Sequence, residues 1–511
     1  MLTTNELLRQ EWTRFRRPGQ LIAMAVAALV VLALGLLYAS GSQASCDGPC
    51  PTDPSGPDGS LVSDQFFFLH RNLGENGSIT VRLTSMSGTL TYPPPNHDQI
   101  VPGLVPWAKA GIIIKDGVRQ GSSYAALMLT GSHGVRMQYD YRHDIAGSAS
   151  SAGKVSARAP RWLRLTRSGE TITGHESADG KQWATVGTAK LSGLPKTVQI
   201  GLFATSPGDL TLRSVGLGGA TEETRFTQAG GAFDHVSLKG AASAGGWSSE
   251  AVGEMNHTDW EKYHKASGAV IEANGTITVT GTGDIGPVGT EGGRPMERIL
   301  VGMPLGLLVV LVVAVRFVTS QYRREAAGGA LVTRGVLAAK AVVVGAAAFV
   351  TGVLAVGTVV PVGLAILKAN GIPVIGVSAL TAVRVVVGSA TALALAAVLA
   401  LTLGAMIRRG RLASLVALSA IAVPYAVTAF PLLADGLSQW LLRVTPAAGF
   451  AVQQTLIEYP QVVSHYAPSA GYFPLPWWAG LAVLCAYTVM ALGLALSRLP
   501  RSDERAEQPV D

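Results

Sequence analysis

The sequence has few charged residues and few cysteines for its length. Asp, Glu, Lys and Arg make up 14% of its 511 residues, whereas soluble domains carry about a quarter. Its three cysteines are too few for a disulfide framework. Because apolar residues still reach 48%, the composition excludes a disordered chain. The length predicts more than one domain.

Several chemical signatures are missing from the sequence. It contains no G-x-x-x-x-G-K-[ST] segment, so this chain cannot itself cradle the phosphates of ATP. No His, Cys, Asp or Glu spacing matches a zinc or EF-hand site, so we predict no bound metal. We assign no catalytic residue and expect a protein that is not an enzyme.

The charges that are present are unevenly distributed. Residues 41–298 hold 22 basic and 24 acidic side chains, a net charge of −2, while the rest of the chain carries +9. A basic protein could bind nucleic acid. Here, however, the basic residues border apolar runs, and this pattern indicates membrane topology instead, with no nucleic-acid partner.

Six apolar runs are long enough to cross a bilayer as helices, which takes about 20 residues. A signal peptide could explain the first, but a 20-residue polar leader precedes it, so we predict an uncleaved span. Leu7, Leu8, Trp12 and Phe15 give that leader an amphipathic pattern, which favours a helix in the membrane surface over a solvated extension. The six runs are 21–40, 299–318, 336–367, 379–406, 412–434 and 477–497.

The positive-inside rule orients these spans. With both termini in the cytoplasm, fifteen basic residues of the membrane part face inside, and only Lys368, Arg384 and Arg443 face outside. Residues 41–298 are then extracellular, and residues 498–511 form a cytoplasmic tail. Cys46 and Cys50 lie on the oxidising side, where they could pair or remain two free thiols. We therefore expect a multi-pass cell-membrane protein that contacts lipid.

The external block has the pattern of a β-sandwich. Residues 41–60 are rich in Pro, Gly and Asp and indicate a linker. Short, often alternating strand runs separated by turn residues then predict an antiparallel sandwich over 61–237 and a β-rich stalk over 238–298. The strand runs are 78–83, 110–115, 124–130, 134–141, 161–167, 171–177, 183–189, 197–205 and 210–217.

The strands of this block resemble a known family. The series WAKAGIIIKDG, YAALMLT, HGVRMQYDY and PRWLRLTRSGETITGHESADGKQWATVG is similar to concanavalin A-like jelly-roll domains, including the type found at the C-terminus of beta-xylosidases. Some jelly rolls of that superfamily hydrolyse glycosides, which takes a pair of carboxylates. The E-x-D-x-x-E strand of those enzymes is absent, so we expect no hydrolysis.

Extracellular glycan binding is a separate hypothesis for the jelly roll. Tyr139 and Tyr141 are the candidate residues for stacking on a sugar ring. We expect Trp107, Trp162 and Trp183 to fill the sandwich core, as tryptophans at alternating strand positions usually do.

The membrane half resembles the permease subunits of bacterial ABC-2-type transporters. The resemblance rests on FVTSQYRREAAGGALVTRGVLAAKA, where the family carries a Glu-Tyr-Arg-Arg-like sequence at the inner end of its second span and LAAKA at the start of its third. Tyr322, Arg323 and Arg324 match the first motif, although Gln321 stands where the family often has Glu. The segments LLRVTPAAGFAVQQT and GYFPLPWWAG match the outer region before the last span. The resemblance covers residues 1–40 and 299–497.

This resemblance implies a transport function. A separate ATPase subunit would bind ATP and drive export, and permeases of this family usually pair as homodimers or with a related chain. Tyr322, Arg323 and Arg324 would contact the ATPase; alternatively, the arginines only fix topology and meet lipid phosphates. A second hypothesis is a membrane-anchored sensor or carbohydrate-binding protein without transport. Six spans are excessive for an anchor, so we favour the permease.

Overall fold

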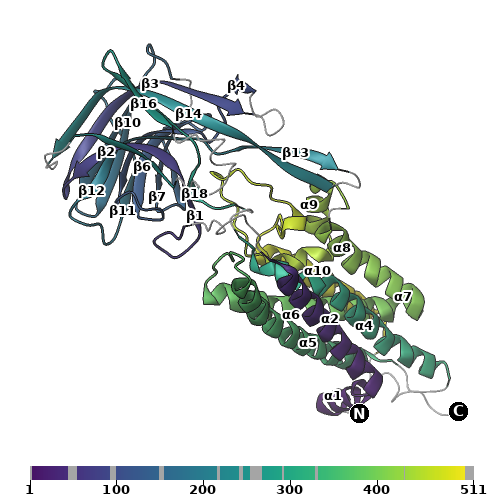
Figure 1. Cartoon of the computed structure of the whole chain (residues 1–511). Coiled ribbons are helices and arrows are strands. Elements are labelled where there is room, and N and C mark those ends of the chain that lie inside the picture. Colours follow the sequence, from purple (N-terminus) through teal and green to yellow (C-terminus); the bar gives the residue numbers. More distant parts are fainter. Residues whose placement is uncertain are drawn as a thin grey trace.

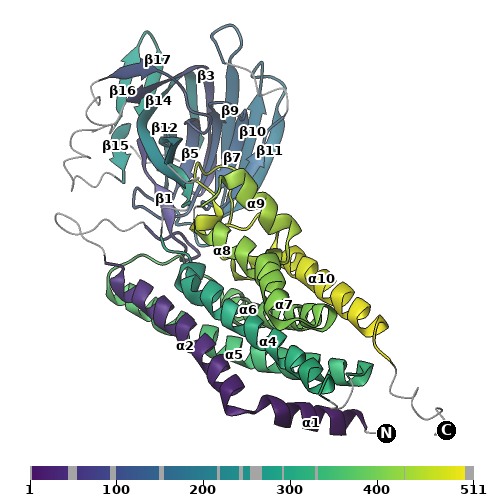
Figure 2. The same cartoon turned by 90° about the vertical axis from the view of Figure 1, so that its right-hand side faces the viewer.

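The computed structural model describes residues 3–43, 54–91, 99–148, 155–215, 219–240, 246–253, 268–289, 293–327, 332–430 and 432–500. Figure 1 shows two parts: a β-domain, here called the head, and a helical bundle. Helix α1 (Thr4–Phe15) and the end of α10 (Trp477–Ser497) lie at the end of the bundle away from the head (Figure 2). Arg323, Arg334 and Arg408 lie there too, and we call it the basic end.

Among the described residues, six helical segments are long and apolar enough to span a membrane, in agreement with the six predicted runs. The first is α2 (Pro18–Gly41), and the second joins the 3₁₀ turn η2 (Met296–Gly302) to α4 (Met303–Glu325). They continue as α5 (Arg334–Ala369), α6 (Ala379–Ile407), the segment Gly410–Ala429 and α10. Their apolar side chains share one buried core.

The fifth segment is irregular and ends before the predicted run does. It consists of α7 (Gly410–Ala417), a π-helical turn η3 (Leu418–Ala422) and α8 (Val423–Ala429). The π turn comes directly before Pro424, whose ring disturbs the hydrogen bonds of the preceding helical turn. The helix stops at Phe430, which is extended, because a residue before proline disfavours the α conformation.

Two short elements follow this segment on the head side of the bundle. They are α9 (Asp435–Val444) and the 3₁₀ segment η4 (Pro446–Gln453), which packs against α6 and α10. The turn η5 (Pro468–Ala470) lies in the loop that leads on to α10.

The head is a sandwich of two antiparallel sheets (Figure 1). The seven-stranded sheet has the order β15-β2-β12-β5-β6-β7-β8, and the larger sheet has the path β11-β10-β9-β3-β14-β17-β16, with β4 beside β3 and β13 beside β14. The strands are β2 (Phe66–Leu73), β3 (Asn76–Thr91), β4 (Ile100–Pro102), β5 (Lys109–Lys115), β6 (Tyr124–Thr130), β7 (Val135–Tyr139), β8 (His143–Ala146), β9 (Arg161–Ser168), β10 (Thr171–Ser177), β11 (Ala184–Lys190), β12 (Val198–Thr205), β13 (Asp209–Val215), β14 (Gly219–Gly240), β15 (Ser248–Val252), β16 (Ala269–Ala273) and β17 (Thr276–Gly281).

The predicted sandwich is confirmed, but its predicted end at 237 and the stalk over 238–298 are corrected. Residues in that range add β15 to the seven-stranded sheet and β16 and β17 to the larger one. β17 pairs with β14 from Ala229↔Gly281 to Phe233↔Ile277. Pairing between strands that are far apart in the sequence leaves no local pattern. Nothing in the sequence therefore indicated that β15, β16 and β17 belong to the sandwich, and the prediction assigned them to a separate stalk.

A two-stranded ribbon carries the chain into and out of the head. It pairs β1 (Val62–Asp64) with β18 (Ile285–Pro287). Two lysines of β5 bind it from the same face of the sheet, because residues of equal parity on a strand point the same way. Lys115 Nζ lies 2.7 Å from the carboxylate of Asp64, and Lys109 Nζ lies 2.5 Å from that of Asp284. The two ion pairs therefore hold the β1–β18 ribbon, where the chain enters and leaves the head, against the seven-stranded sheet.

A partly exposed ion pair joins two long strands of the larger sheet and should make the head sensitive to acid. Arg82 donates from Nε and an Nη to the two carboxylate oxygens of Asp234, at 2.7 and 2.6 Å. This hydrogen bonding is the main cause that lowers the pKa of Asp234. The pair therefore stabilises the fold only while Asp234 is ionised.

We expect Asp234→Asn to cost about 1 kcal/mol at neutral pH. A carboxyl with a depressed pKa loses its contribution as the pH falls through the folded value. The difference in unfolding free energy between wild type and variant should therefore stay constant down to about pH 4 and disappear below it. Thermal unfolding of the detergent-solubilised chain, followed by the β-sheet circular dichroism, measures this difference. A difference that persists at pH 2 would contradict the assignment, and Glu223→Gln, in an exposed pair with Arg213, is the control.

Candidate functional site

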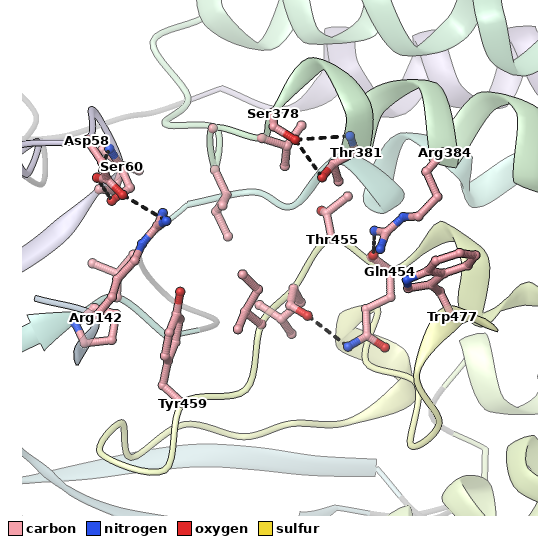
Figure 3. Close-up of a pocket in the computed structure, with 18 of the residues that line it drawn as sticks. Asp58, Ser60, Arg142, Ser378, Thr381, Arg384, Gln454, Thr455, Tyr459 and Trp477 are labelled. Carbon is pink, nitrogen blue, oxygen red and sulfur yellow. Dashed lines mark hydrogen bonds and ion pairs between the residues drawn. The ribbon is translucent and has the colours of Figure 1, made fainter. Parts of the chain in front are cut away.

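The described residues form a cavity of about 790 Å³ between the head and the bundle. Its lining comes from segments far apart in the sequence. On the side of the head, the lining consists of the linker residues 58–61, Arg142, and residues 287–288 at the end of β18. The start of α6, residues 454–459 and the start of α10 form the side of the bundle. Figure 3 shows side chains from both parts facing this space.

Two arginines line the cavity from opposite parts of the protein (Figure 3). Arg142, from the head, lies 2.8 Å from the carboxylate of Asp58. Partial burial raises the pKa of Asp58, but the hydrogen bonds from Ser60 and the charge of Arg142 outweigh it, so the net pKa is lowered. Arg384, from α6, donates to the backbone oxygen of Gln454 and lies 5.8 Å from the ring centre of Trp477.

The remaining wall combines hydroxyl, amide and apolar groups. Ser378 caps α6 by accepting a hydrogen bond from the backbone N–H of Thr381 at 3.2 Å, so the N-terminus of α6 opens onto the cavity. Tyr459 lines the opposite side (Figure 3), and burial raises the pKa of its hydroxyl. The apolar part comes from Leu61, Val288, Ile375, Val377, Leu456, Ile457 and Leu475. Such a mixed lining can hold a ligand that has a polar and an apolar end.

A buried carboxylate fixes the loop that forms the floor of the cavity. Glu297, in η2, accepts hydrogen bonds from the backbone N–H groups of Thr455 and Leu456 at 3.0 and 3.1 Å and from the Thr455 hydroxyl. Its side chain is 7% exposed. Backbone donors therefore take up this negative charge, and the floor is held to the start of the second span.

The hairpin of β13 and β14 reaches from the head to the bundle (Figure 1). Near its far end Glu222 lies 3.1 Å from Nδ1 of His465, in the loop before α10. The other ring nitrogen of His465 lies 2.6 Å from Asp435 at the start of α9. This carboxylate–histidine–carboxylate arrangement ties the head to the bundle at a second place besides the ribbon.

At the basic end, α1 packs against the bundle through a buried ion pair. Lys340 Nζ, on α5, lies 2.5 Å from a carboxylate oxygen of Glu11, and their side chains are 0% and 1% exposed. The ammonium also lies 3.9 Å from the ring centre of Phe317. Phe15 packs edge-to-face on the same ring at 5.2 Å. The lysine of the LAAKA segment thus holds the N-terminal helix.

The candidate coupling residues lie beside this contact. Tyr322 is half-buried under the guanidinium of Arg408, which is 5.1 Å from its ring centre. Arg323 and Arg324 lie in the last turn of α4, and both are exposed. The structure therefore leaves the two arginines accessible at the end of the bundle that also carries α1. Whether they contact an ATPase stays a prediction.

The two candidate glycan-binding residues differ in how deeply the structure buries them. Tyr141 is 1% exposed, and its hydroxyl donates to Asp64 at 2.8 Å, so its assignment as a stacking residue is corrected: the ring is part of the core. Tyr139 is half-buried and stacks on His143, with ring centres 4.1 Å apart, and its role stays a prediction. Cys46 and Cys50 lie outside the described residues.

The three tryptophans predicted for the core also differ in their burial. Trp107 is buried, as expected. Trp162 and Trp183 are only half-buried, and the guanidinium groups of Arg82 and Arg164 lie 5.8 and 3.9 Å from their ring centres. Each of these two rings therefore lies partly at the surface beside an arginine guanidinium, where a cation–π contact takes the place of core packing.

The comparisons with known proteins name no family. No family model and no curated protein matches the sequence. Among solved structures, scytalido-glutamic peptidase with a transition state analog inhibitor shares 9% identity at a TM-score of 0.26 and covers 43% of this chain and 98% of its own. SCP-B, a peptidase of the Eqolisin family, shares 9% at 0.24, covering 42% and 98%. A functionally unknown protein from Saccharomyces cerevisiae shares 16% at 0.22, covering 38% and 84%. At these TM-scores none bears on function.

Proposed function

We propose that this chain is the permease subunit of an ABC-type exporter, that a separate ATPase subunit drives it, and that the head stands outside the cell over the exit. The arrangement of the bundle supports this proposal. Six helices are long and apolar enough to cross a membrane, and the head lies at the end opposite α1. Placing the basic end in the cytoplasm satisfies the positive-inside rule.

The observation that carries the proposal is the surface at the basic end. Helix α1, held by Glu11 and Lys340, lies beside the exposed Arg323 and Arg324 at the end of α4. A buried ion pair between an N-terminal helix and the bundle gives that helix a fixed position, which an anchor does not require. A rigid basic surface is suited to receive an acidic patch of an ATPase subunit.

The test is to reverse the two exposed charges. Arg323→Glu together with Arg324→Glu should weaken association with the ATPase subunit by about tenfold or more and lower substrate-stimulated ATP hydrolysis accordingly. The chain is co-expressed with candidate ABC-type ATPase subunits from the same genome, and co-purification and ATP hydrolysis are measured in nanodiscs. Arg443→Glu, an exposed site near the head, is the matched control.

The outcomes separate the permease from a sensor. If the double variant reaches the cell surface normally and couples as well as the Arg443→Glu control, the docking role is refuted. If no ATPase subunit co-purifies with the wild type, a membrane-anchored sensor, with the head as its ligand-binding part, becomes the better explanation.

A further inference from the structure

We propose that the cavity between the head and the bundle binds an anionic membrane lipid, with the phosphate-bearing headgroup inside and the acyl chains along the exposed face of α6. This deepens the proposed function and rests on it in one respect: the lipid, or an amphiphile of the same chemistry, would be the exported substrate. The charge, the size and the surroundings of the cavity support the proposal independently.

The charge of the lining favours an anion. Among the described residues of the lining, the charged ones are Arg142, Arg384 and Asp58, which gives one positive charge in excess. One Nη of Arg384 donates to the backbone oxygen of Gln454, and the buried Nε of Arg384 has no hydrogen-bond partner among the described residues. A planar guanidinium with unused donors suits a phosphate. The N-termini of α6 and α10 line the same space and add a favourable dipole.

The volume of the cavity favours a ligand much larger than a single ion. About 790 Å³ accommodates a group of many atoms, since sites for drug-sized molecules span roughly 300–1,000 Å³. The apolar residues among the lining, such as Ile457 and Leu475, would face the glycerol backbone and the first methylenes rather than water. A headgroup with the beginning of its chains fills such a space better than a free sugar does.

The surroundings supply a place for acyl chains. Leu380, Val383 and Val387 follow one face of α6 and are 83%, 58% and 44% exposed. This face begins at the turn that contains Thr381 and Arg384, so it starts beside the cavity lining. Trp477, at the cavity, and Trp478, which is exposed, stand where α10 begins, a position that aromatic residues favour at a membrane–water interface.

The test measures lipid binding to the purified full chain without any ATPase subunit. Native mass spectrometry is used to titrate the detergent-solubilised protein with dioleoyl-phosphatidylglycerol, with dioleoyl-phosphatidylcholine and with inorganic phosphate. We expect preferential binding of phosphatidylglycerol. Arg384→Gln and Arg142→Gln should each weaken it by about tenfold or more, and Arg384→Lys should weaken it less than Arg384→Gln does.

Arg443→Gln, which removes an arginine outside the cavity, should bind phosphatidylglycerol as the wild type does. Equal binding of the two lipids, or wild-type binding by both glutamine variants, would overturn the proposal. Saturation by inorganic phosphate at the same concentration would also overturn it, because the acyl chains would then add nothing. Arg142→Gln changes the head and Arg384→Gln the bundle, so misfolding of one variant leaves the other informative.

The binding experiment and an export assay of the reconstituted chain together separate the two proposals. If the lipid binds as expected but the reconstituted chain exports nothing with any ATPase subunit, the permease function fails and the lipid site stands. If export proceeds but phosphatidylglycerol does not bind, the lipid site fails and the permease function stands.

Discussion

Glu11→Gln should release the N-terminal helix from the bundle. The substitution leaves the Lys340 ammonium buried without a carboxylate, and breaking a buried pair in this way costs about 3–5 kcal/mol. Both side chains are almost fully buried, so solvent cannot take over the role of Glu11. Amide hydrogen exchange over Thr4–Phe15, measured in nanodiscs, should accelerate by about a hundredfold to a few thousandfold.

Two further variants make this result interpretable. Glu6→Gln changes another carboxylate of α1, but glutamine can keep the capping box that Glu6 forms with Thr3, so its exchange should stay close to wild type. Glu11→Gln combined with Lys340→Met removes both charges and should recover most of the protection, because no fully buried charge remains unpaired. Arg14, which also contacts Glu11, is partly exposed to solvent. Equal exchange in Glu6→Gln and Glu11→Gln would show that the ion pair does not hold α1.

If α1 holds the ATPase surface in place, undocking it should also reduce coupling. The Glu11→Gln variant would then lower substrate-stimulated ATP hydrolysis even though Arg323 and Arg324 are unchanged. The Glu11→Gln/Lys340→Met variant should restore it, because a docked helix is what the surface requires. A coupling defect that the double variant leaves in place would assign a direct role to Glu11 or Lys340 instead.

The sequence predicted the helices better than the contacts between them. Long apolar runs identify spans because length and composition are local properties. The Glu11–Lys340 pair joins residues 329 positions apart, and no local pattern distinguishes that lysine from a topology signal. The count of positive charges expected on the cytoplasmic side included Lys340 with the arginines, whereas the structure buries this lysine.

The alternating strands were predicted, whereas β2, a strand buried on both faces, was missed. RWLRLTR and TITGHES alternate and coincide with β9 and β10, but β2 reads FFFLHRNL. Phe67 and Leu69 face the core between the sheets, while Phe66 and Phe68 face a second apolar cluster under the ribbon. A strand buried on both faces loses the period of two that reveals strands in a sequence.

The cavity could not be predicted from the sequence at all. Its two arginines lie in different parts of the fold, and Arg384 looked like a minor exception to the charge rule. Only the fold brings Arg142 and Arg384 to the same cavity. The buried hydroxyl of Tyr141 donates to Asp64, and this contact positions the neighbouring Arg142. A charge that opposes a strong topological bias is a signal that could have identified Arg384 as a candidate.

Asp64→Asn should have the largest effect on the head. The carboxylate of Asp64 accepts from Lys115 Nζ at 2.7 Å, from the Tyr141 hydroxyl at 2.8 Å and from the backbone N–H of Gly121 at 2.8 Å. Asparagine leaves the fully buried Lys115 without a counter-charge, so we expect a loss of about 3–5 kcal/mol. Burial already lowers the pKa of Lys115 despite the attraction of Asp64, which shows how costly the unpaired cation would be.

The loss should appear as a lower unfolding temperature of the head in the detergent-solubilised chain, followed by β-sheet circular dichroism. Asp64→Asn with Lys115→Met should recover most of it, since methionine removes the charge and keeps an apolar stem of similar shape. Glu223→Gln, in an exposed ion pair, should shift the temperature little. Because β1 joins the head to α2, Asp64→Asn should also loosen Arg142 over the cavity and weaken phosphatidylglycerol binding. Destabilisation with unchanged lipid affinity would mean that the ribbon supports the head alone and does not position the site.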